Sequence, residues 1–367
     1  MATVPITLPH HRYEIRIQPG LLGSVGKLVR QVAPHDRAAL IQDAVVADLH
    51  GPAVSCSLRD AGFDLLEAKL EAGEQQKNLD TARSLYDLML NGRMERLSPL
   101  VALGGGVVGD TAGFVAATFL RGVPFVQCPT TLLAMVDASV GGKVGVNVPQ
   151  GKNLVGAFHQ PCLVAIDTDT LKTLPARELR CGLAECVKHA LIRDESLFDW
   201  IDQNLSAILG LNSDALVELV ERNVHIKAAV VMADEKESGQ RAHLNFGHTF
   251  AHAIEATQSY DSGGHHHGEA VALGMVAATG LAVSLGRCPG DVLDRLTALL
   301  GRIGLPVADK GLAAPQRLLA AMRHDKKVQD GRIRLVLPDR IGSVGIVSDV
   351  VADQIERAWG ELGEGGE

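Results

Sequence analysis

Hydrophobic and polar positions alternate at period two near the N-terminus. Residues 7–18 contain two short extended runs, and Tyr13-Glu14-Ile15-Arg16-Ile17 places its apolar side chains on one face, as in a half-buried strand. Strand-like and helix-like runs then alternate: we expect strands at 38–43, 64–70 and 100–103, and helices at 21–32, 52–61 and 78–91. This alternation indicates an α/β layer with parallel strand pairing.

The pattern changes after residue 173, where helical periodicity dominates. We expect helices at 175–189, 197–209, 213–232, 244–256, 269–285 and 289–303, and a hairpin formed by 332–337 and 343–347. The fold class is therefore predicted to be α/β, with a Rossmann-like α/β domain over residues 1–177 and a mainly helical domain over residues 178–367.

Composition excludes several classes of protein. Of 367 residues, 46% are hydrophobic and 21% charged, which is ordinary for a globular chain. Aromatic residues are only 4%, which argues against a stacking platform for single-stranded nucleic acid. The net charge of −8 disfavours a nucleic-acid or anionic-membrane binder. The 6 cysteines form no C-x-x-C pair, and no signal peptide or transmembrane segment is seen, so we expect reduced thiols and a cytoplasmic protein.

A glycine-rich segment follows the strand expected at 100–103. Gly104, Gly106 and Gly109 satisfy G-x-G-x-x-G, and a helix is expected to begin near Asp110. Such glycines let backbone N–H groups approach a pyrophosphate at a helix N-terminus. The motif is weak alone, because the acidic residue usual about 20 positions later is missing. A structural tight turn is the alternative, and residues 73–77 are a candidate partner for an adenosine ribose.

Two Gly-Lys pairs lie close together in sequence that we expect to form loops. Gly142-Lys143 and Gly151-Lys152 suit an anion pocket, since lysine supplies charge and glycine supplies access. Neither matches a Walker A loop. The alternative is a solvated turn, but residues 122–149 carry no charge apart from Asp137 and Lys143, and charges in such surroundings usually have a partner.

The helical half contains residues typical of a metal site. Glu185 and Lys188 lie one turn apart on one helix face, and His248 and His252 have the i, i+4 spacing that lets two imidazoles converge. The run 265–267 adds three histidines before Gly268-Glu269. Two or three histidines with one carboxylate form a common open zinc site, although helix-surface or core histidines are the alternative. H-E-x-x-H is absent, which disfavours a metalloprotease.

Taken together, these segments resemble the 3-dehydroquinate synthase family of sugar phosphate cyclases. The resemblance rests on residues 103–110, 129–133, 137–143, 151–153, 174–175, 182–185, 244–250, 267–269 and 325–327, in family order over nearly the whole chain. It implies an NAD-binding α/β domain, a helical metal- and substrate-binding domain, and an active site in the interdomain cleft. It also implies NAD, one divalent metal (zinc or cobalt), a sugar phosphate substrate and a homodimer, with no nucleic acid or membrane partner.

The resemblance assigns roles to individual residues. Glu185, His248 and His267 match the metal ligands, which makes His252 a substrate-side or proton-transfer residue. The NAD contacts fall on Asp43, Gly73, Glu74, Lys77, Gly105, Gly106, Val107, Val108, Gly109, Asp110, Thr130, Thr131, Asp137, Lys143, Lys152, Thr170, Leu171, Lys172 and Thr173. The catalytic and substrate residues fall on Arg121, Lys143, Lys152, Asn153, Lys188, Lys227, Glu237, Arg241, Asn245, His252 and Lys326.

The sequence departs from the family at two places. The acidic residue usual before Gly73 is absent, which affects one adenosine contact. The His-rich stretch before His267 leaves open which histidine binds the metal, although His267 fits best because Gly268-Glu269 follows it directly.

The implied activity is that of a phosphate-eliminating carbon–oxygen lyase of the shikimate pathway. It converts 3-deoxy-D-arabino-heptulosonate 7-phosphate into 3-dehydroquinate by transient NAD-mediated oxidation, phosphate elimination, reduction, ring opening and aldol closure. Three alternatives remain: another sugar phosphate cyclase making 2-deoxy-scyllo-inosose or a valiolone, a metal-dependent alcohol or glycerol dehydrogenase, and a non-catalytic NAD- and metal-binding sensor. Arg241 and Lys227 favour a substrate that carries a carboxylate.

Overall fold

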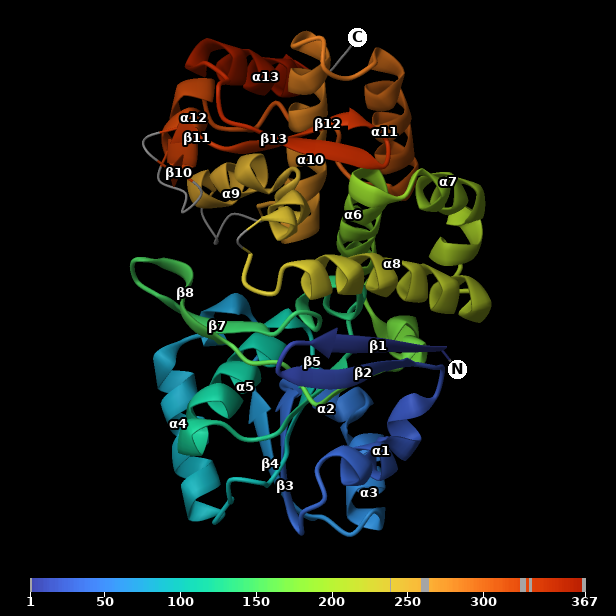
Figure 1. The fold of residues 1–367 in the computed structure, drawn as a ribbon, viewed down its shortest axis with the longest axis vertical. Coiled ribbons are helices and arrows are strands. Elements are labelled where there is room, and N and C mark those ends of the chain that lie inside the picture. The colour runs from blue at the N-terminus through green and yellow to red at the C-terminus, as the bar shows by residue number, and fades with distance from the viewer. Residues whose placement is uncertain (1, 238, 259–263, 324–327, 330–331, 365–367) are drawn as a thin grey trace. The chain divides into compact units, whose positions relative to one another are not determined.

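The computed structural model describes residues 2–237, 239–258, 264–323, 328–329 and 332–364 (Figure 1). Its contacts divide the chain into two units. The first comprises Met1–Leu179 with Leu211–Lys236, and the second Arg180–Gly210 with Glu237–Glu367. Helix α8 (Ser213–Ala233) therefore groups with the α/β unit, although it follows the expected boundary at residue 177 along the chain.

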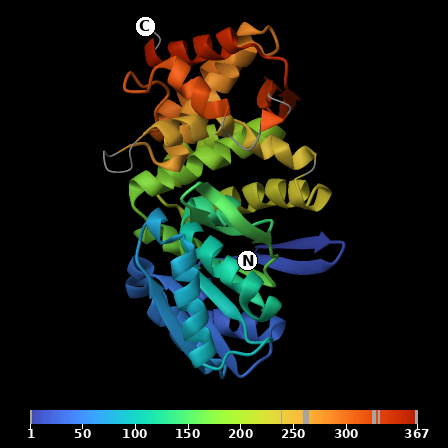
Figure 2. The same cartoon turned by 90° about the vertical axis from the view of Figure 1, so that its left-hand side faces the viewer.

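The first unit is built on a seven-stranded sheet of order β1-β2-β9-β6-β5-β3-β4. All neighbours are parallel except the β1–β2 hairpin, which extends from the edge of the sheet (Figure 2). The strands are β1 (Ala2–Leu8), β2 (His11–Ile17), β3 (Arg37–Asp43), β4 (Asp64–Leu70), β5 (Leu100–Gly104), β6 (Phe125–Pro129) and β9 (Leu163–Ile166). The predicted α/β class and the strands expected at 38–43, 64–70 and 100–103 are confirmed.

Helices cover both faces of this sheet, which is why its central strands read as continuous apolar runs. On β3, Leu40 packs with residues of α1 (Val25–Val32) and α3 (Gly51–Asp60), whereas the next residue, Ile41, packs with α4 (Leu79–Asn91) and α5 (Gly106–Thr118). Both side chains are fully buried. The alternation of side chains along a strand thus divides the core of this unit into two layers.

The strand order reverses between β3 and β5. Along the chain, β4 follows β3 on one side of it, whereas β5, β6 and β9 extend in the other direction. Ligands of open α/β sheets bind outside the carboxyl ends of the strands at such a switch point. Here those ends bring Asp43, the last residue of β3, next to Gly104, the last residue of β5. The topology therefore marks the same edge that the glycine motif indicated.

Two local predictions in the first unit are wrong. Helix α5 begins at Gly106 instead of near Asp110, so the glycine motif runs from the last residue of β5 into the first turn of the helix. Of the two Gly-Lys pairs expected in loops, only Gly142 lies outside a strand, because β7 (Lys143–Val148) and β8 (Gly151–Phe158) form an antiparallel hairpin. Val144 and Val146 are buried, and both belong to the core layer that contains α5. This burial explains why a glycine-rich, lysine-bearing segment becomes extended.

The second unit is mainly helical, as predicted, with a hairpin of β12 (Leu335–Arg340) and β13 (Ser343–Val347). Its helices are α6 (Ala176–Arg193, whose first turn belongs to the first unit), α7 (Glu195–Leu209), α9 (His248–Thr257), α10 (His267–Ser284), α11 (Gly290–Ile303), α12 (Pro315–Arg323) and α13 (Ala352–Glu364). The helix expected at 244–256 begins only at His248, because 240–245 form a 3-10 helix. The short pair β10 (Val328–Gln329) and β11 (Arg332–Ile333) takes the first residues of the expected hairpin.

Helix α10 is the core helix of this unit. It is the one helix in the described chain that is long and apolar enough to cross a membrane, but 67% of that window is buried inside the protein. It packs closely on α9, since a Cβ added at Gly274 would lie 2.2 Å from the carbonyl oxygen of Gly247. Its start is equally tight, because a Cβ at Gly268 would lie 2.3 Å from the Cys181 carbonyl oxygen. These glycines hold the start of α10 against α6 and α9.

Candidate functional site

The carboxyl end of β5 leads directly into the N-terminus of α5. Gly105 is the N-cap and makes no side-chain hydrogen bond, so the first N–H groups of the helix receive no side-chain cap. Helix N-termini of this kind bind phosphate groups through those N–H groups and the helix dipole. Gly104 has a φ of +159°, and a Cβ there would lie 3.1 Å from Val108 and 3.3 Å from the Cβ of Asp43.

The surroundings of this helix start fit a dinucleotide. A Cβ at Gly105 would lie 3.2 Å from the Thr131 methyl group, so glycine keeps space between the two segments. The Thr130 hydroxyl is buried, and no group among the described residues hydrogen-bonds it. The Asp43 carboxylate caps α2 (Ala44–Leu49) by accepting from the amides of Val45 and Val46, at 2.9 and 3.2 Å. The uncapped helix start offers N–H donors suited to a pyrophosphate, and the Thr130 hydroxyl is a further polar group at the same edge of the sheet.

The turn at Gly73–Lys77 is attached to the same edge. Lys77 is only 4% exposed, and its ammonium forms an ion pair with Asp110 in the first turns of α5. Burial raises the pKa of the Asp110 carboxyl, and the charge of Lys77 opposes that rise. The expected adenosine-side turn and the glycine motif are thus brought together in the structure. Thr170, Leu171, Lys172 and Thr173 lie on a 3-10 helix (Thr168–Thr173), where the Thr170 hydroxyl lies 3.4 Å from the Thr130 carbonyl oxygen.

Asp137 lies in a short π-helix (Ala134–Ala138), an irregularity frequent at functional sites. Lys227 reaches it from α8, with 2.5 Å between its Nζ and Asp137 Oδ1, and it also donates to the Asp137 carbonyl. The Lys227 side chain is 7% exposed and that of Asp137 27%. A residue expected to contact NAD and one expected to contact substrate therefore form an ion pair within the first unit.

In the second unit, one carboxylate and two imidazoles converge. Glu185 on α6 is fully buried, and its Oε1 lies 3.6 Å from His248 Nε2 and 3.7 Å from His267 Nε2. Ligand atoms of the three residues lie within 4.8 Å of one another. His248 begins α9 and His267 begins α10, so two helix starts present the imidazoles to one face of α6.

The outer nitrogens of both imidazoles are held by acceptors. His248 Nδ1 lies 3.2 Å from the Phe246 carbonyl oxygen, and His267 Nδ1 lies 3.0 Å from Glu255 Oε1. Because a carbonyl and a carboxylate only accept, each Nδ1 carries the proton and each Nε2 faces Glu185. Zinc-binding histidines are oriented in this way by a carbonyl or a carboxylate.

The charge balance of this cluster also suits a cation. Burial lowers the pKa of His267, but hydrogen bonds to Glu185 and Glu255 and the charge of both carboxylates outweigh it and raise that pKa to about 10. Lys188 pairs with Glu185 from the next turn of α6. The negative charges of Glu185 and Glu255 thus favour cations at this buried position. The donor set of one carboxylate oxygen and two imidazole nitrogens fits a divalent ion such as zinc.

The structure distinguishes the three consecutive histidines. His265 Nε2 lies 2.7 Å from Asp309 Oδ2, and His267 faces Glu185. His266 is the N-cap of α10: one of its ring nitrogens accepts from the amide of Glu269. In a neutral imidazole the other nitrogen then carries the proton and is a donor, which is unsuited to metal binding.

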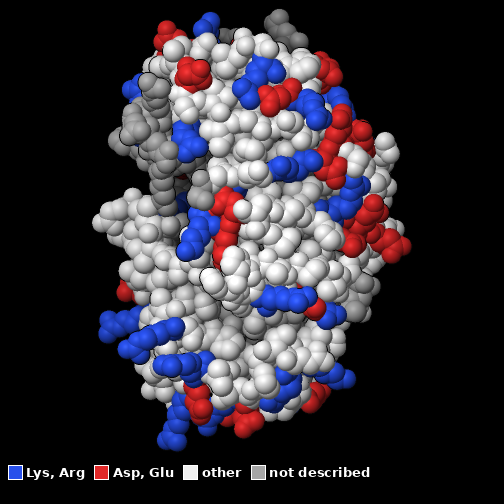
Figure 3. Space-filling view, in the orientation of Figure 1, with Lys and Arg blue, Asp and Glu red and all other residues white. Residues whose placement is uncertain are grey.

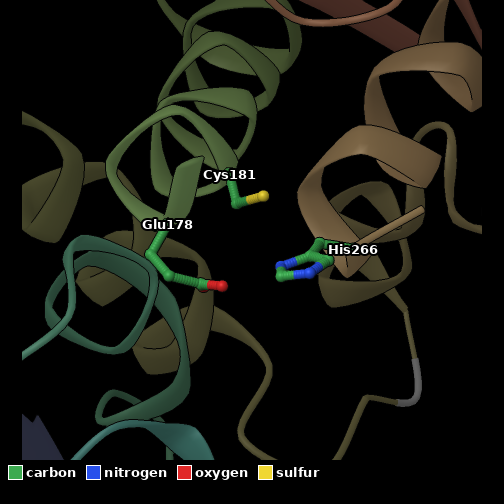
Figure 4. Close-up of side chains that lie close together, drawn as sticks. All are labelled: Glu178, Cys181 and His266. Carbon is green, nitrogen blue, oxygen red and sulfur yellow. The ribbon is translucent and has the colours of Figure 1, made fainter. Parts of the chain in front are cut away.

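This bears on a second group of possible ligands, Glu178, Cys181 and His266. Figure 4 shows Glu178 and Cys181 one turn apart on α6, with His266 at the start of α10. Since a ring nitrogen of His266 caps α10, we do not assign a metal centre to this group.

The remaining expected residues fall in three places. Arg241 is 2% exposed, and Asn245 Nδ2 donates to Glu237 Oε1 at 2.9 Å within the second unit. The His252 ring lies edge-on to that of His248 at 5.8 Å, outside the cluster around Glu185. In the first unit, Lys152 and Asn153 are exposed on β8, and Arg121 has a φ of +67°. Lys326 lies outside the described residues.

Two residues in these networks were not predicted from the sequence. Glu255 follows His248 by seven positions and so lies on the same helix face, a spacing that gave a usable signal. Asn147 hydrogen-bonds both Glu74 and the Asn153 amide, and only the strand pairing reveals it. The face drawn in Figure 3 carries both basic and acidic side chains, and several basic ones lie close together at its lower left.

Comparison with known proteins gives consistent matches. The family models described as 3-dehydroquinate synthase N-terminal and C-terminal match residues 67–181 and 182–328. A 3-dehydroquinate synthase from Desulforamulus reducens is 47% identical over 350 residues, covering 95% of this chain and 97% of the relative.

Two solved structures have similar folds. The 2-epi-5-epi-valiolone synthase of Streptomyces hygroscopicus subsp. jinggangensis 5008, with NAD⁺ and Zn²⁺ bound, has a TM-score of 0.89 at 31% identity and covers 98% of each chain. A 2-deoxy-scyllo-inosose synthase complexed with carbaglucose-6-phosphate, NAD⁺ and Co²⁺ has a TM-score of 0.89 at 26% identity, covering 99% of this chain and 100% of its own.

Proposed function

The chain belongs to the 3-dehydroquinate synthase family, and on that premise we propose that it converts 3-deoxy-D-arabino-heptulosonate 7-phosphate into 3-dehydroquinate and phosphate. The observation that carries the proposal is the cluster of Glu185, His248 and His267 in a chain similar over 95% of its length to a synthase of that name. The enzyme would be a phosphate-eliminating carbon–oxygen lyase of the shikimate pathway, cytoplasmic and homodimeric.

Two cofactors are part of the proposal. Residues 1–177 would hold NAD at the α5 N-terminus and the Gly73–Lys77 turn, and residues 178–367 would hold zinc or cobalt on Glu185, His248 and His267. The support is the fit of both donor sets and the NAD⁺ with Zn²⁺ or Co²⁺ bound by the two similar structures. When bound, NAD supplies a reversible hydride acceptor and the metal polarises a substrate hydroxyl.

The chain's own residues would bind, orient and exchange protons. In the first unit, Lys143 and Lys152 offer point charges for a phosphate dianion. Asn153 follows Lys152 on β8, and Arg121 ends a 3-10 helix (Phe119–Arg121). Lys227 would offer a cation for the substrate carboxylate, and in this structure it forms an ion pair with Asp137.

In the second unit, buried Arg241 offers a fork of donors suited to a carboxylate. Glu237, held by Asn245, would accept a proton, and His252 would relay one close to the metal cluster. Lys188 would remain the counter-ion of Glu185.

The second candidate is another sugar phosphate cyclase of the 2-deoxy-scyllo-inosose type, favoured by the 26% identity over 99% of the chain with the synthase that binds carbaglucose-6-phosphate. The two candidates differ in whether the substrate carries a carboxylate. The test compares phosphate release from the heptulosonate phosphate with release from glucose 6-phosphate, using protein loaded with zinc or cobalt and NAD⁺. Turnover of the carboxylate-bearing substrate alone supports our proposal, whereas preference for glucose 6-phosphate supports the second candidate.

A variant of Arg241 tests whether this residue recognises the substrate carboxylate. Arg241→Gln keeps polarity but removes the charge, so it should raise KM for the carboxylate substrate. A variant with unchanged KM would remove the assigned role of Arg241.

A further inference from the structure

Asn147 occupies an irregular point of the β7–β8 hairpin. Val146 pairs with Val155 and Val148 pairs with Gly151, so a single residue of β7 lies opposite three residues of β8. Those three residues are Lys152, Asn153 and Leu154, of which the first two are proposed substrate contacts. Bulges of this kind redirect side chains and are frequent beside functional sites.

The side-chain amide of Asn147 hydrogen-bonds two different segments of the chain. Its Nδ2 donates to Glu74 Oε1 at 2.8 Å, and its Oδ1 accepts from the backbone amide of Asn153 at 2.9 Å. Its own amide donates to the Lys77 carbonyl oxygen at 2.7 Å. One half-buried amide thus joins the proposed adenosine-side turn to the proposed phosphate-binding segment, all within the first unit.

The backbone at Asn153 needs such support. Its φ is +55°, in the left-handed region, where asparagine is tolerated at a modest cost. Asn153 and its neighbour Lys152 are exposed, so their side chains do not belong to a packed core. The bond from the Asn153 amide to Asn147 is therefore an important constraint on where Lys152 projects.

We propose that Asn147 is a positioning residue that couples occupation of the Gly73–Lys77 turn to the conformation of residues 152–154. A dinucleotide that orders the turn would also order the anion-binding segment, so cofactor and sugar phosphate would each strengthen binding of the other. The identity of the two ligands rests on the proposed function. The coupling itself rests on the three hydrogen bonds.

A double-variant rescue tests the bridge. Asn147→Asp places a carboxylate against Glu74 and should weaken NAD binding and raise KM for the sugar phosphate by about tenfold each, with a smaller change in kcat. Glu74→Gln restores a donor, because the new amide can donate to the introduced carboxylate while that carboxylate still accepts from the Asn153 amide. In the Glu74→Gln background, Asn147→Asp should therefore change both constants by less than about twofold. Equal effects in the two backgrounds would overturn the proposal.

Hydrogen exchange gives a readout that needs no turnover. Without ligand, Asn147→Ala should speed amide exchange at Asn153 at least tenfold relative to the parent protein, and NAD should slow exchange at residues 151–154 in the parent but not in the variant. Unchanged exchange at Asn153 without ligand would overturn the bridge. If the parent protein binds no NAD, the proposed function fails, while the ligand-free comparison still decides the role of Asn147.

Discussion

Glu255 Oε1 accepts the Nδ1 proton of His267 at 3.0 Å. This bond fixes the imidazole so that Nε2 faces Glu185, and it increases the basicity of the ring. A carboxylate behind a ligating histidine typically contributes 10- to 100-fold to metal affinity. We therefore predict that Glu255→Gln raises the dissociation constant for zinc by about 10- to 100-fold.

Competition with a fluorescent chelator measures this constant. The matched control is Glu195→Gln. Glu195 lies on α7, is half exposed and pairs with Arg295, so this change should leave zinc affinity unchanged. Equal zinc affinity in the parent protein and in Glu255→Gln would show that Glu255 does not orient a ligand.

The assignment of ligands predicts a contrast between Glu185 and His252. Glu185 provides the carboxylate of the cluster, whereas His252 lies edge-on to the His248 ring, outside that cluster. Glu185→Ala should lose bound metal after dialysis, and His252→Ala should retain it with a reduced rate. Elemental analysis decides between the two, and metal loss confined to His252→Ala would reverse the assignment.

His159 should make stability depend on pH. It stacks on Phe125, and its Nε2 lies 3.0 Å from the Val123 carbonyl oxygen. Burial lowers the pKa of His159, partly offset by that carbonyl. Below pH of about 6.5 the unfolded chain therefore binds more protons than the folded one, so the free energy of unfolding should fall as the pH falls.

Denaturant titrations between pH 5 and 8 test this dependence. His159→Gln should flatten the profile below about pH 6.5 relative to the parent protein. A profile that His159→Gln leaves unaltered would exclude this source of acid sensitivity.

Gly113 lies where α5 crosses β7. A Cβ there would lie 2.3 Å from Val144 Cγ1 and 3.0 Å from Phe125, both rigid core side chains. Gly113→Ala should reduce the free energy of unfolding by about 1–3 kcal/mol, because the core must move to accept the methyl group. Gly106→Ala is the matched control, since its Cβ would meet only Ala138 at 3.6 Å. Equal denaturation midpoints for the two variants would contradict this description of the packing.

The sequence predicted regular elements well and their irregularities poorly. Alternation at Tyr13–Ile17 and the apolar run ending at Asp43 gave the right strands, because burial dictates both patterns. The β7–β8 hairpin was missed, since its glycines indicate loops unless the burial of Val144 against the core is known. The division of contacts that groups α8 with the α/β unit likewise depends on tertiary packing.

For the site, spacing along the chain was informative only within one helix. It indicated that Glu185 and Lys188 share a face, and they form an ion pair. The i, i+4 pair His248 and His252 was a misleading signal for convergence, because the structure groups His248 with His267 from another helix. Asn147 gave no sequence signal at all, since its role arises from a bulge that pairs one residue with three.

The most direct test of the proposed function follows phosphate, product and cofactor together. Purified protein loaded with zinc or cobalt and NAD⁺ is given 3-deoxy-D-arabino-heptulosonate 7-phosphate, while absorbance at the NADH band is recorded. We predict one phosphate and one 3-dehydroquinate per substrate consumed, with no net accumulation of NADH. Net reduction of NAD⁺, or no release of phosphate by the loaded protein, would contradict the account.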